Sequence, residues 1–286
     1  MRTADIFKKK TVFSLEVFPP KPDADESVIF DTLGQLSDVK PDFISVTYGA
    51  GGGKNGCNTI KIASAIENVC GIDSVAHMPC INMTRQQAKD VLDSMKENGI
   101  ENVLALRGDI PEGSSAQGDF AHADELVSFI KENYDFNVVA ACYPEKHPES
   151  RDVIDDIKRL KGKVDCGVDH LITQLFLDNS YFYDFYEKAQ LAGINVPIEA
   201  GIMPVTNKRQ IERMVKLCGV ALPDKFIRIL DRYGDDEVAL RDAGIAYAVD
   251  QITDLITQDV AGIHLYTMNN SFIAHKIHDA VQNLIK

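Results

Sequence analysis

Short runs of β-branched and aromatic residues alternate with longer amphipathic stretches along the whole chain. Short runs bounded by turn residues predict strands, and stretches with apolar residues three and four positions apart predict helices. The predicted strands cover residues 11–18, 42–47, 73–77, 102–106, 137–142, 170–176, 197–202 and 262–266. The predicted helices cover 25–36, 58–69, 84–98, 124–132, 148–161, 180–191 and 207–217. Eight strands separated by helices favour an α/β protein with a closed parallel (βα)8 TIM barrel. An open doubly wound sheet is the alternative.

The connection between the last two predicted strands is longer than the others. Residues 220–260 carry two helical patterns, 223–233 and 237–258, where one helix would suffice. We therefore predict a barrel with an extra helix in this connection. The chain has 286 residues without an internal repeat or linker, and α/β barrels often reach ~250 residues as one domain. We expect residues 1–286 to form a single domain.

Charge and apolar content limit the partners of the chain. With 43 acidic and 30 basic residues its net charge is −13, which repels nucleic-acid phosphates and anionic membranes. No stretch approaches the ~20 apolar residues of a membrane span, and the first ten residues lack the apolar core of a secretion signal. We expect a cytoplasmic protein that binds neither nucleic acid nor membranes. The six cysteines lack zinc spacing, so we predict no metal site.

A lone carboxylate, Glu16, stands in the first predicted strand shortly before a double proline. Alternation along a strand places Glu16 on the same face as Ser14 and Phe18, with apolar residues on the other face. Strands of parallel sheets are buried on both sides, and burial favours the protonated form of a carboxyl, which can donate a proton near neutral pH. The alternative is an edge strand with a solvated glutamate.

Polar, aromatic and glycine residues cluster where six of the predicted strands end. They are Glu16 and the segments 47–53, 77–80, 107–111, 143–148 and 173–176. Active sites of barrels form at the carboxyl ends of the strands, so a barrel would gather these segments around one site.

Several of these segments also have a structural interpretation. The glycine-rich segment 47–53 has neither the P-loop ending nor the GxGxxG spacing, so it could be a flexible turn. Arg107 and Asp109 could form ion pairs at the barrel rim, and His77 and His147 could be core histidines with satisfied hydrogen bonds. The remaining histidines show no triad or ligand spacing, and we assign them no role.

A series of motifs resembles the short bacterial form of the methylenetetrahydrofolate reductase family. The motifs are FSLEVFPPK (13–21), SVTYGA (45–50), HMPC (77–80), ALRGDIP (105–111), YPEKHPE (143–149), KVDCG (163–167), ITQLFLD (172–178) and GIMPVTN (201–207). They occur in order and with near-family spacing from about residue 10 to residue 275. The resemblance implies a (βα)8 barrel holding a flavin, normally FAD with FMN as the alternative. It would pass hydride from NADH or NADPH to 5,10-methylenetetrahydrofolate and give 5-methyltetrahydrofolate, which supplies methionine synthesis.

The resemblance also implies roles for individual residues. Glu16 matches the general acid that opens the folate ring, and Asp109 matches an aspartate near flavin and pterin whose charge favours a cationic iminium. Flavin-contacting positions are matched by Thr47, Tyr48, Ala50, His77, Arg107, Gly108, Asp109, Tyr143, His147, Asp156 and Lys163. Among these, Arg107, His147 and Lys163 would line the cofactor's diphosphate. Substrate-side positions are matched by Gln174, Gln210, Met214 and Tyr266.

The chain departs from the family pattern on the side of the electron donor. Met214 stands where a phenylalanine often stacks on substrate or nicotinamide, and Asn270 stands where an arginine is common. Methionine can still cover a flat ring. These departures keep two alternatives open beside the NAD(P)H-dependent reductase, which we expect to be a homo-oligomer. One is a flavin subunit fed by an iron-sulfur partner protein, and the other is a non-catalytic barrel that binds folate or flavin.

Overall fold

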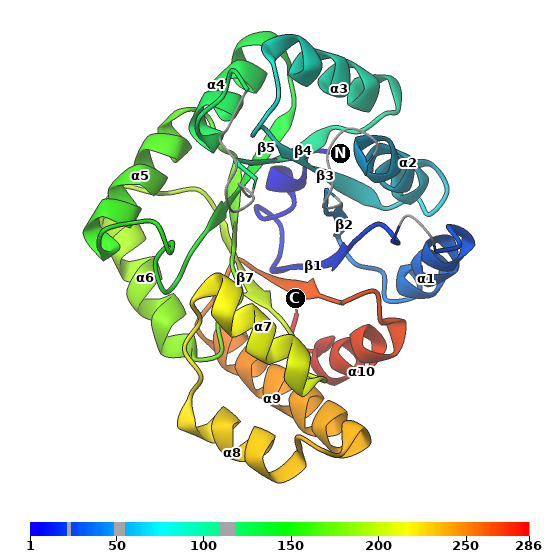
Figure 1. The fold of residues 1–286 in the computed structure, drawn as a ribbon, viewed down its shortest axis with the longest axis vertical. Helices are drawn as coiled ribbons and strands as arrows, with labels where there is room; N and C mark the ends of the chain where they lie inside the picture. Colours follow the sequence, from blue (N-terminus) through cyan, green and yellow to red (C-terminus); the bar gives the residue numbers. More distant parts are fainter. Residues whose placement is uncertain (22–23, 49–54, 109–117, 286) are drawn as a thin grey trace.

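The computed structural model describes residues 1–21, 24–48, 55–108 and 118–285. Its eight strands pair in parallel in chain order and close into a barrel, because β1 pairs with both β2 and β8 (Figure 1). The strands are β1 (Val12–Val17), β2 (Phe43–Val46), β3 (Asp73–Pro79), β4 (Asn102–Leu106), β5 (Asn137–Cys142), β6 (His170–Thr173), β7 (Ile198–Ile202) and β8 (Gly262–Tyr266). The closed barrel confirms the predicted fold class. It also shows that the edge-strand alternative for Glu16 is wrong, since a closed barrel has no edge.

Helices surround the barrel as an outer ring (Figure 1). They are α1 (Ser27–Ser37), α2 (Asn55–Asn68), α3 (Arg85–Glu97), α4 (Ala123–Asn133), α5 (Val153–Asp165), α6 (Asn179–Leu191), α7 (Lys208–Cys218), α8 (Asp224–Tyr233), α9 (Glu237–Thr257) and α10 (Ser271–Val281), with a short 3-10 helix η1 (Thr3–Asp5) at the start. Side-chain caps fix several of their starts. Thr84 forms a capping box with Gln87, and Asp178 accepts a hydrogen bond from Ser180 N.

Several elements differ from the sequence-based expectations, and three of the differences concern the site or the outer ring. The helix expected at 148–161 begins only at Val153, because Asp152 accepts a hydrogen bond from Asp155 N at 2.8 Å and caps it there. Strand β6 ends at Thr173, and the following Leu175 packs with the helices of the β7–β8 connection. Helix α10 was not predicted, although Asn270 caps its first turn.

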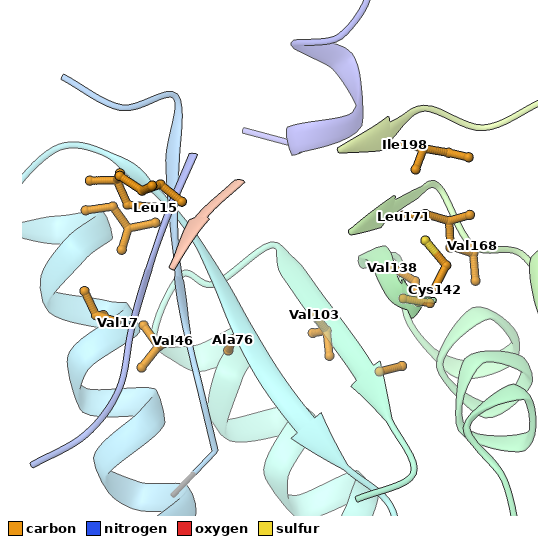
Figure 2. Packing of buried hydrophobic residues seen from close by; sticks show 14 of the residues in the cluster. Leu15, Val17, Val46, Ala76, Val103, Val138, Cys142, Val168, Leu171 and Ile198 are labelled. Atoms are coloured by element: carbon orange, nitrogen blue, oxygen red, sulfur yellow. The ribbon is translucent and has the colours of Figure 1, made fainter. Parts of the chain in front are cut away.

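Alternate residues of β1 face opposite sides, as predicted. Leu15 and Val17 belong to the large apolar cluster between the barrel and the outer helices, where Figure 2 shows them on the same side as Val46. Ser14 and Glu16 point instead into the barrel, where Ser14 contacts Glu199 and His264. The interior of this barrel is therefore polar around Ser14 and Glu16.

The amino-terminal end of the barrel is closed by residues that precede β1. Ile6 and the partly buried Phe7 pack against an apolar layer inside the barrel that includes Val12 and Phe43. Hydrogen bonds fix this segment, since Thr3 N donates to Asn102 Oδ1 at 2.9 Å.

The connection between β7 and β8 contains α7, α8 and α9, which confirms an extra helical layer there. Helix α8 lies at the outside of the ring, while α7 lies nearer the barrel (Figure 1). Leu175, Phe226 and Tyr247 belong to the second apolar cluster, which these helices share with the end of the barrel. In α9, Gly244 lies against the backbone of Val205, and an added Cβ would be 1.8 Å from Val205 O. The glycine therefore allows α9 to approach the segment after β7 closely.

Candidate active site

A cavity of about 1250 Å³ opens at the carboxyl ends of the strands. Its volume exceeds the roughly 300–1,000 Å³ of ordinary small-molecule pockets, so it has room for a cofactor and a substrate together. Most of the site residues predicted from the sequence line it, namely Glu16, Thr47, Tyr48, His77, Arg107, Gly108, Tyr143, His147, Gln174, Met214 and Tyr266. The structure therefore brings together residues that lie far apart in the sequence.

The lining does not include all of the predicted site residues. Asp156, Lys163 and Gln210 are not in the lining of this cavity. Ala50 and Asp109 lie outside the residues that the structure describes.

Glu16 lies at the floor of the cavity, where β1 ends. Its side chain is 18% exposed, and its Oε2 lies 3.5 Å from each of three polar atoms: His77 Nε2, His264 Nε2 and Ser45 Oγ. Burial lowers the pKa of His77 to about 4, so this imidazole is neutral near pH 7. The carboxyl thus has these three polar groups on one side and the cavity on the other.

His77 differs from the core histidine that the structural interpretation proposed. It is buried, but its Nε2 has no hydrogen-bond partner within the described segments of the chain. Its ring faces Glu16, and its electrostatic interaction with that carboxylate opposes the burial effect on its pKa.

Arg107 forms an ion pair at the rim, as the structural interpretation proposed, with Glu149 as the partner. Its two terminal nitrogens donate to the Glu149 carboxylate at 2.6 and 2.7 Å. This hydrogen bond lowers the pKa of Glu149. The side chain of Arg107 still lines the cavity, so the pair places a guanidinium beside it.

The backbone after β4 requires glycine. Gly108 has a φ of +89°, and an added Cβ would lie 2.9 Å from side-chain atoms of both Ile81 and Pro79.

Two aromatic side chains that follow β5 also line the cavity. The rings of Tyr143 and His147 meet edge to face with centroids 4.6 Å apart. Burial lowers the pKa of His147.

Lys163 and Asp156 lie on α5, behind the lining. Lys163 Nζ donates to Ala141 O at 2.6 Å, and burial lowers the pKa of this amine. The buried Asp156 accepts a hydrogen bond from Ser150 Oγ at 2.7 Å. Both side chains thus support the β5 end of the site.

The expected substrate side is built by β6, α7 and β8. Tyr266 donates its hydroxyl proton to Thr173 O at 2.7 Å, and burial raises the pKa of this phenol well above its usual value. Gln174 uses its Oε1 to accept a hydrogen bond from Leu175 N. Gln210 has a buried Nε2 without a hydrogen-bond partner in the described part of the chain.

Sequence reasoning missed the residues directly beneath Glu16. His264, to which we assigned no role, pairs with Ser14 across the β1–β8 ladder, and Ser45 pairs with Glu16 across the β1–β2 ladder. Alternation along the last strand places His264 on the same face as Tyr266, which was the available signal. The apolar Met203 and Met268 also line the cavity.

The described residues contain no group of histidine, cysteine or acidic side chains that could hold a metal ion. Five of the six cysteines have described side chains, and these five, Cys70, Cys80, Cys142, Cys166 and Cys218, are free thiols. No helix among the described segments is long and apolar enough to cross a membrane.

The fold and the cavity define the class of this protein as a (βα)8 barrel with a binding site at the carboxyl ends of its strands. A family model described as methylenetetrahydrofolate reductase matches residues 2–282. The chain therefore belongs to the methylenetetrahydrofolate reductase family, which confirms the resemblance found in its motifs.

Curated relatives agree with this assignment. The chain is 34% identical over 264 residues to 5,10-methylenetetrahydrofolate reductase of Escherichia coli strain K12, with 92% of this chain and 88% of that protein covered. It is 36% identical over 278 residues to methylenetetrahydrofolate reductase (NADH) 1 of Arabidopsis thaliana, with 91% of this chain covered. It spans only 46% of the plant protein's length.

A solved structure shares the fold. An uncharacterized protein from Clostridium thermocellum, described as binding two copies of 5-methyl-5,6,7,8-tetrahydrofolic acid, aligns with a TM-score of 0.63 and 14% identity. The alignment covers 99% of both chains.

Proposed function

We propose that this protein reduces 5,10-methylenetetrahydrofolate to 5-methyltetrahydrofolate, using a bound flavin and NADH or NADPH as the hydride donor. The observation that carries the proposal is the position of Glu16 at the floor of a large cavity in a chain of this family. The names of the bacterial and plant relatives support the same reaction.

The cavity fits a flavin. It is large and is lined by mixed polar and apolar groups, and Gly108 brings backbone to its edge where a Cβ would collide with Ile81 and Pro79. The residues that would hold the cofactor are Thr47, Tyr48, His77, Arg107, Gly108, Tyr143 and His147, with Asp156 and Lys163 behind them. When bound, a flavin supplies the carrier that takes up a hydride and gives it to the next acceptor. FAD is our first expectation and FMN the alternative.

The folate would lie between Glu16 and the substrate-side residues. Gln174, Met214 and Tyr266 line the cavity there, and the unpartnered amide of Gln210 on α7 is a donor that a polar ligand would satisfy. Met214 offers a flat ring a flexible apolar contact. Asp109 and Ala50 keep the roles that the resemblance implies, as proposals from the sequence alone.

Glu16 would act as the general acid. Opening the five-membered ring of the substrate breaks a carbon–nitrogen bond, and the leaving nitrogen must gain a proton. The side chain of Glu16 lines the cavity, while its Oε2 lies 3.5 Å from Ser45 and from each of two histidines, so the carboxyl is oriented for this transfer. The same carboxyl has no equivalent task in the uptake of hydride from nicotinamide.

Glu16→Gln tests the proposal because it keeps the size and the hydrogen-bonding oxygen of the side chain but removes the acid. We expect flavin reduction by NAD(P)H at a near-normal rate and folate reduction slowed by ~10²-fold or more. Stopped-flow absorbance of the flavin measures both half-reactions separately. Equal losses in the two half-reactions would refute a specific role of Glu16.

The wild-type trace also tests the source of the electrons. We expect NADH or NADPH to bleach the flavin rapidly. If neither does, while a chemically reduced flavin is reoxidised by methylenetetrahydrofolate, an iron-sulfur partner protein becomes the source.

A further inference from the structure

A continuous chain of polar side chains runs from Glu16 down the interior of the barrel. His264 Nε2 lies 3.5 Å from Glu16 Oε2, and His264 Nδ1 lies 2.6 Å from Ser14 Oγ. Ser14 Oγ in turn lies 2.8 Å from Oε1 of Glu199 on β7. Ser45 Oγ lies 3.4 Å from His264 Nε2 and 3.5 Å from Glu16 Oε2, so it flanks the longest link. One imidazole and one hydroxyl therefore connect two carboxyl groups.

The hydroxyl of Ser14 determines how protons are arranged along this chain. It has one proton and lies within hydrogen-bond distance of both His264 and Glu199, so it accepts from one while it donates to the other. If Ser14 donates to Glu199, His264 carries its proton on Nδ1. If a protonated Glu199 donates to Ser14, then Ser14 donates to His264 Nδ1, and the proton of the imidazole lies on Nε2, facing Glu16. The side chains can therefore pass a proton without changing their positions.

Glu199 is placed to hold that proton. The residue is fully buried, its Oε2 has no hydrogen-bond partner within the described segments, and burial raises its pKa to about 7. Space for it is provided by Gly262, where an added Cβ would lie 2.8 Å from Glu199 Cγ. An acid with this pKa exchanges its proton near neutral pH.

The titratable groups around the two carboxyls come from β3, β6, β8 and the turn before β2. His170 Nε2 lies 3.9 Å from Glu199 Oε2, and burial lowers its pKa to about 3. His77 is likewise neutral near pH 7. Asp42 raises the pKa of Glu199 through its negative charge, and His264 lowers it. Tyr266 keeps its proton because burial raises the pKa of its hydroxyl.

We propose that Glu199, Ser14 and His264 form a proton relay that returns a proton to Glu16. This inference rests on the proposed role of Glu16 as general acid. When Glu16 has given its proton to the substrate nitrogen, its Oε2 takes the Nε2 proton of His264. His264 Nδ1 then takes the hydroxyl proton of Ser14, and Ser14 takes the proton of Glu199. Each transfer breaks one N–H or O–H bond and forms another, so the negative charge moves from Glu16 to Glu199. Solvent later returns one proton per turnover through the cavity. Ser14, His264 and Glu199 are positioning residues, because they act through Glu16.

The first test measures the folate half-reaction of Glu199→Gln and Ser14→Ala from about pH 6 to about pH 9. We expect the rate of both variants to fall at a pH about one unit lower than in the wild type, so that it is roughly tenfold lower above neutral pH. Flavin reduction by NAD(P)H stays unchanged. The control is Glu67→Gln. Glu67 is a partly buried glutamate that, like Glu199, accepts a hydrogen bond from a serine, here Ser74, but it lies outside this chain of side chains. Unchanged profiles, or losses that are equal at every pH, would overturn the relay.

The second test does not depend on folate reduction. Infrared difference spectra between acidic and basic solutions detect the C=O stretch of a protonated carboxyl. We expect such a band to titrate near pH 7 in the wild type, in agreement with the pKa of Glu199, and to disappear in Glu199→Gln but not in Glu67→Gln. Glu16→Gln should move its midpoint, because the two carboxyls exchange protons through one chain of side chains and their titrations are therefore coupled.

These two measurements separate the relay from the proposed function. If the wild type does not reduce methylenetetrahydrofolate at any pH, the proposed function fails, while the infrared spectra still report on the coupling of the two carboxyls. If the infrared band is missing, or if Glu16→Gln does not change the pH midpoint of the band, the relay is refuted whatever substrate the protein reduces.

Discussion

At the scale of single residues, the barrel interior combines groups whose protonation is set by burial. Burial lowers the pKa values of His77 and His170 to about 4 and about 3, and it raises that of Glu199 to about 7. All three therefore resist carrying charge inside the barrel. The side chain of Glu16, unlike those of His170 and Glu199, lines the open cavity.

Glu199 should make stability depend on pH. Its pKa is raised from 4.5 to about 7 in the folded protein, so the folded state binds more protons than the unfolded state between these values. Stability should therefore be highest below about pH 4.5 as far as this residue is concerned, and fall by about 3 kcal/mol as the pH rises to about 7. Glu199→Gln should remove that slope in urea denaturation measured across this range. The exposed Glu97→Gln serves as the control, and a slope retained in Glu199→Gln would contradict the prediction.

The requirement for glycine at position 108 gives a second prediction at this scale. Gly108→Ala must place a Cβ at positive φ and 2.9 Å from Ile81 and Pro79, so we expect a loss of about 1–3 kcal/mol in stability. The distorted cavity edge should also weaken flavin retention. Urea denaturation and the flavin content of the purified protein measure the two effects. A variant with full stability and flavin content would show that this edge can relax.

At the scale of elements, the tightest contact lies between α9 and the segment after β7. Gly34 and Gly244 both lie inside helices, but a Cβ on Gly34 would meet nothing within 4 Å, whereas one on Gly244 would lie 1.8 Å from Val205 O. The two positions therefore offer a matched pair in which helix propensity is equal and packing differs.

Gly34→Ala should raise stability by about 0.5–1 kcal/mol, because alanine favours the helix. Gly244→Ala should lower it by about 1–3 kcal/mol or more, since backbone atoms of two elements must separate. Chemical denaturation of both variants measures the two changes in the free energy of unfolding. Equal stabilisation by both substitutions would mean that α9 can move away from Val205 without a loss of stability.

Elements whose pattern is local were predicted from the sequence, and contacts created by barrel closure were not. The alternation of β1 placed Ser14 and Glu16 on one face correctly, and the strands at 102–106, 137–142 and 262–266 agree at both ends. Helix α10 was predictable as well, since Ile273, Ile277 and Val281 are four residues apart. The position of Glu199 was not predictable, because both faces of a barrel strand are buried. Only closure pairs β8 with β1, and this pairing brings Glu199 on β7 within reach of Ser14 on β1.

At the scale of the whole molecule, the barrel has one open end and one closed end. The cavity lies at the carboxyl ends of the strands, and Ile6 and Phe7 fill the opposite end together with the apolar layer around Phe43. The polar chain from Glu16 to Glu199 lies between them.

Ile6→Ala should test how much this closure contributes to the fold. Ile6 is 6% exposed, so the substitution leaves a void inside the barrel and should cost about 2–5 kcal/mol of unfolding free energy. Val69→Ala, at a position that is 82% exposed, should change stability by less than about 0.5 kcal/mol. Thermal or urea unfolding compares the two, and equal effects would mean that the amino-terminal segment does not support the barrel.

The closed end has a consequence for how the interior exchanges with water. With Ile6 and Phe7 in place, the amino-terminal end of the barrel is closed, and the chain of side chains that leads from the cavity to Glu199 begins at Glu16. A ligand bound over Glu16 would then separate these side chains from the water in the cavity. While that ligand stays bound, the number of protons on the side chains from Glu16 to Glu199 would not respond to the pH of the surrounding solution.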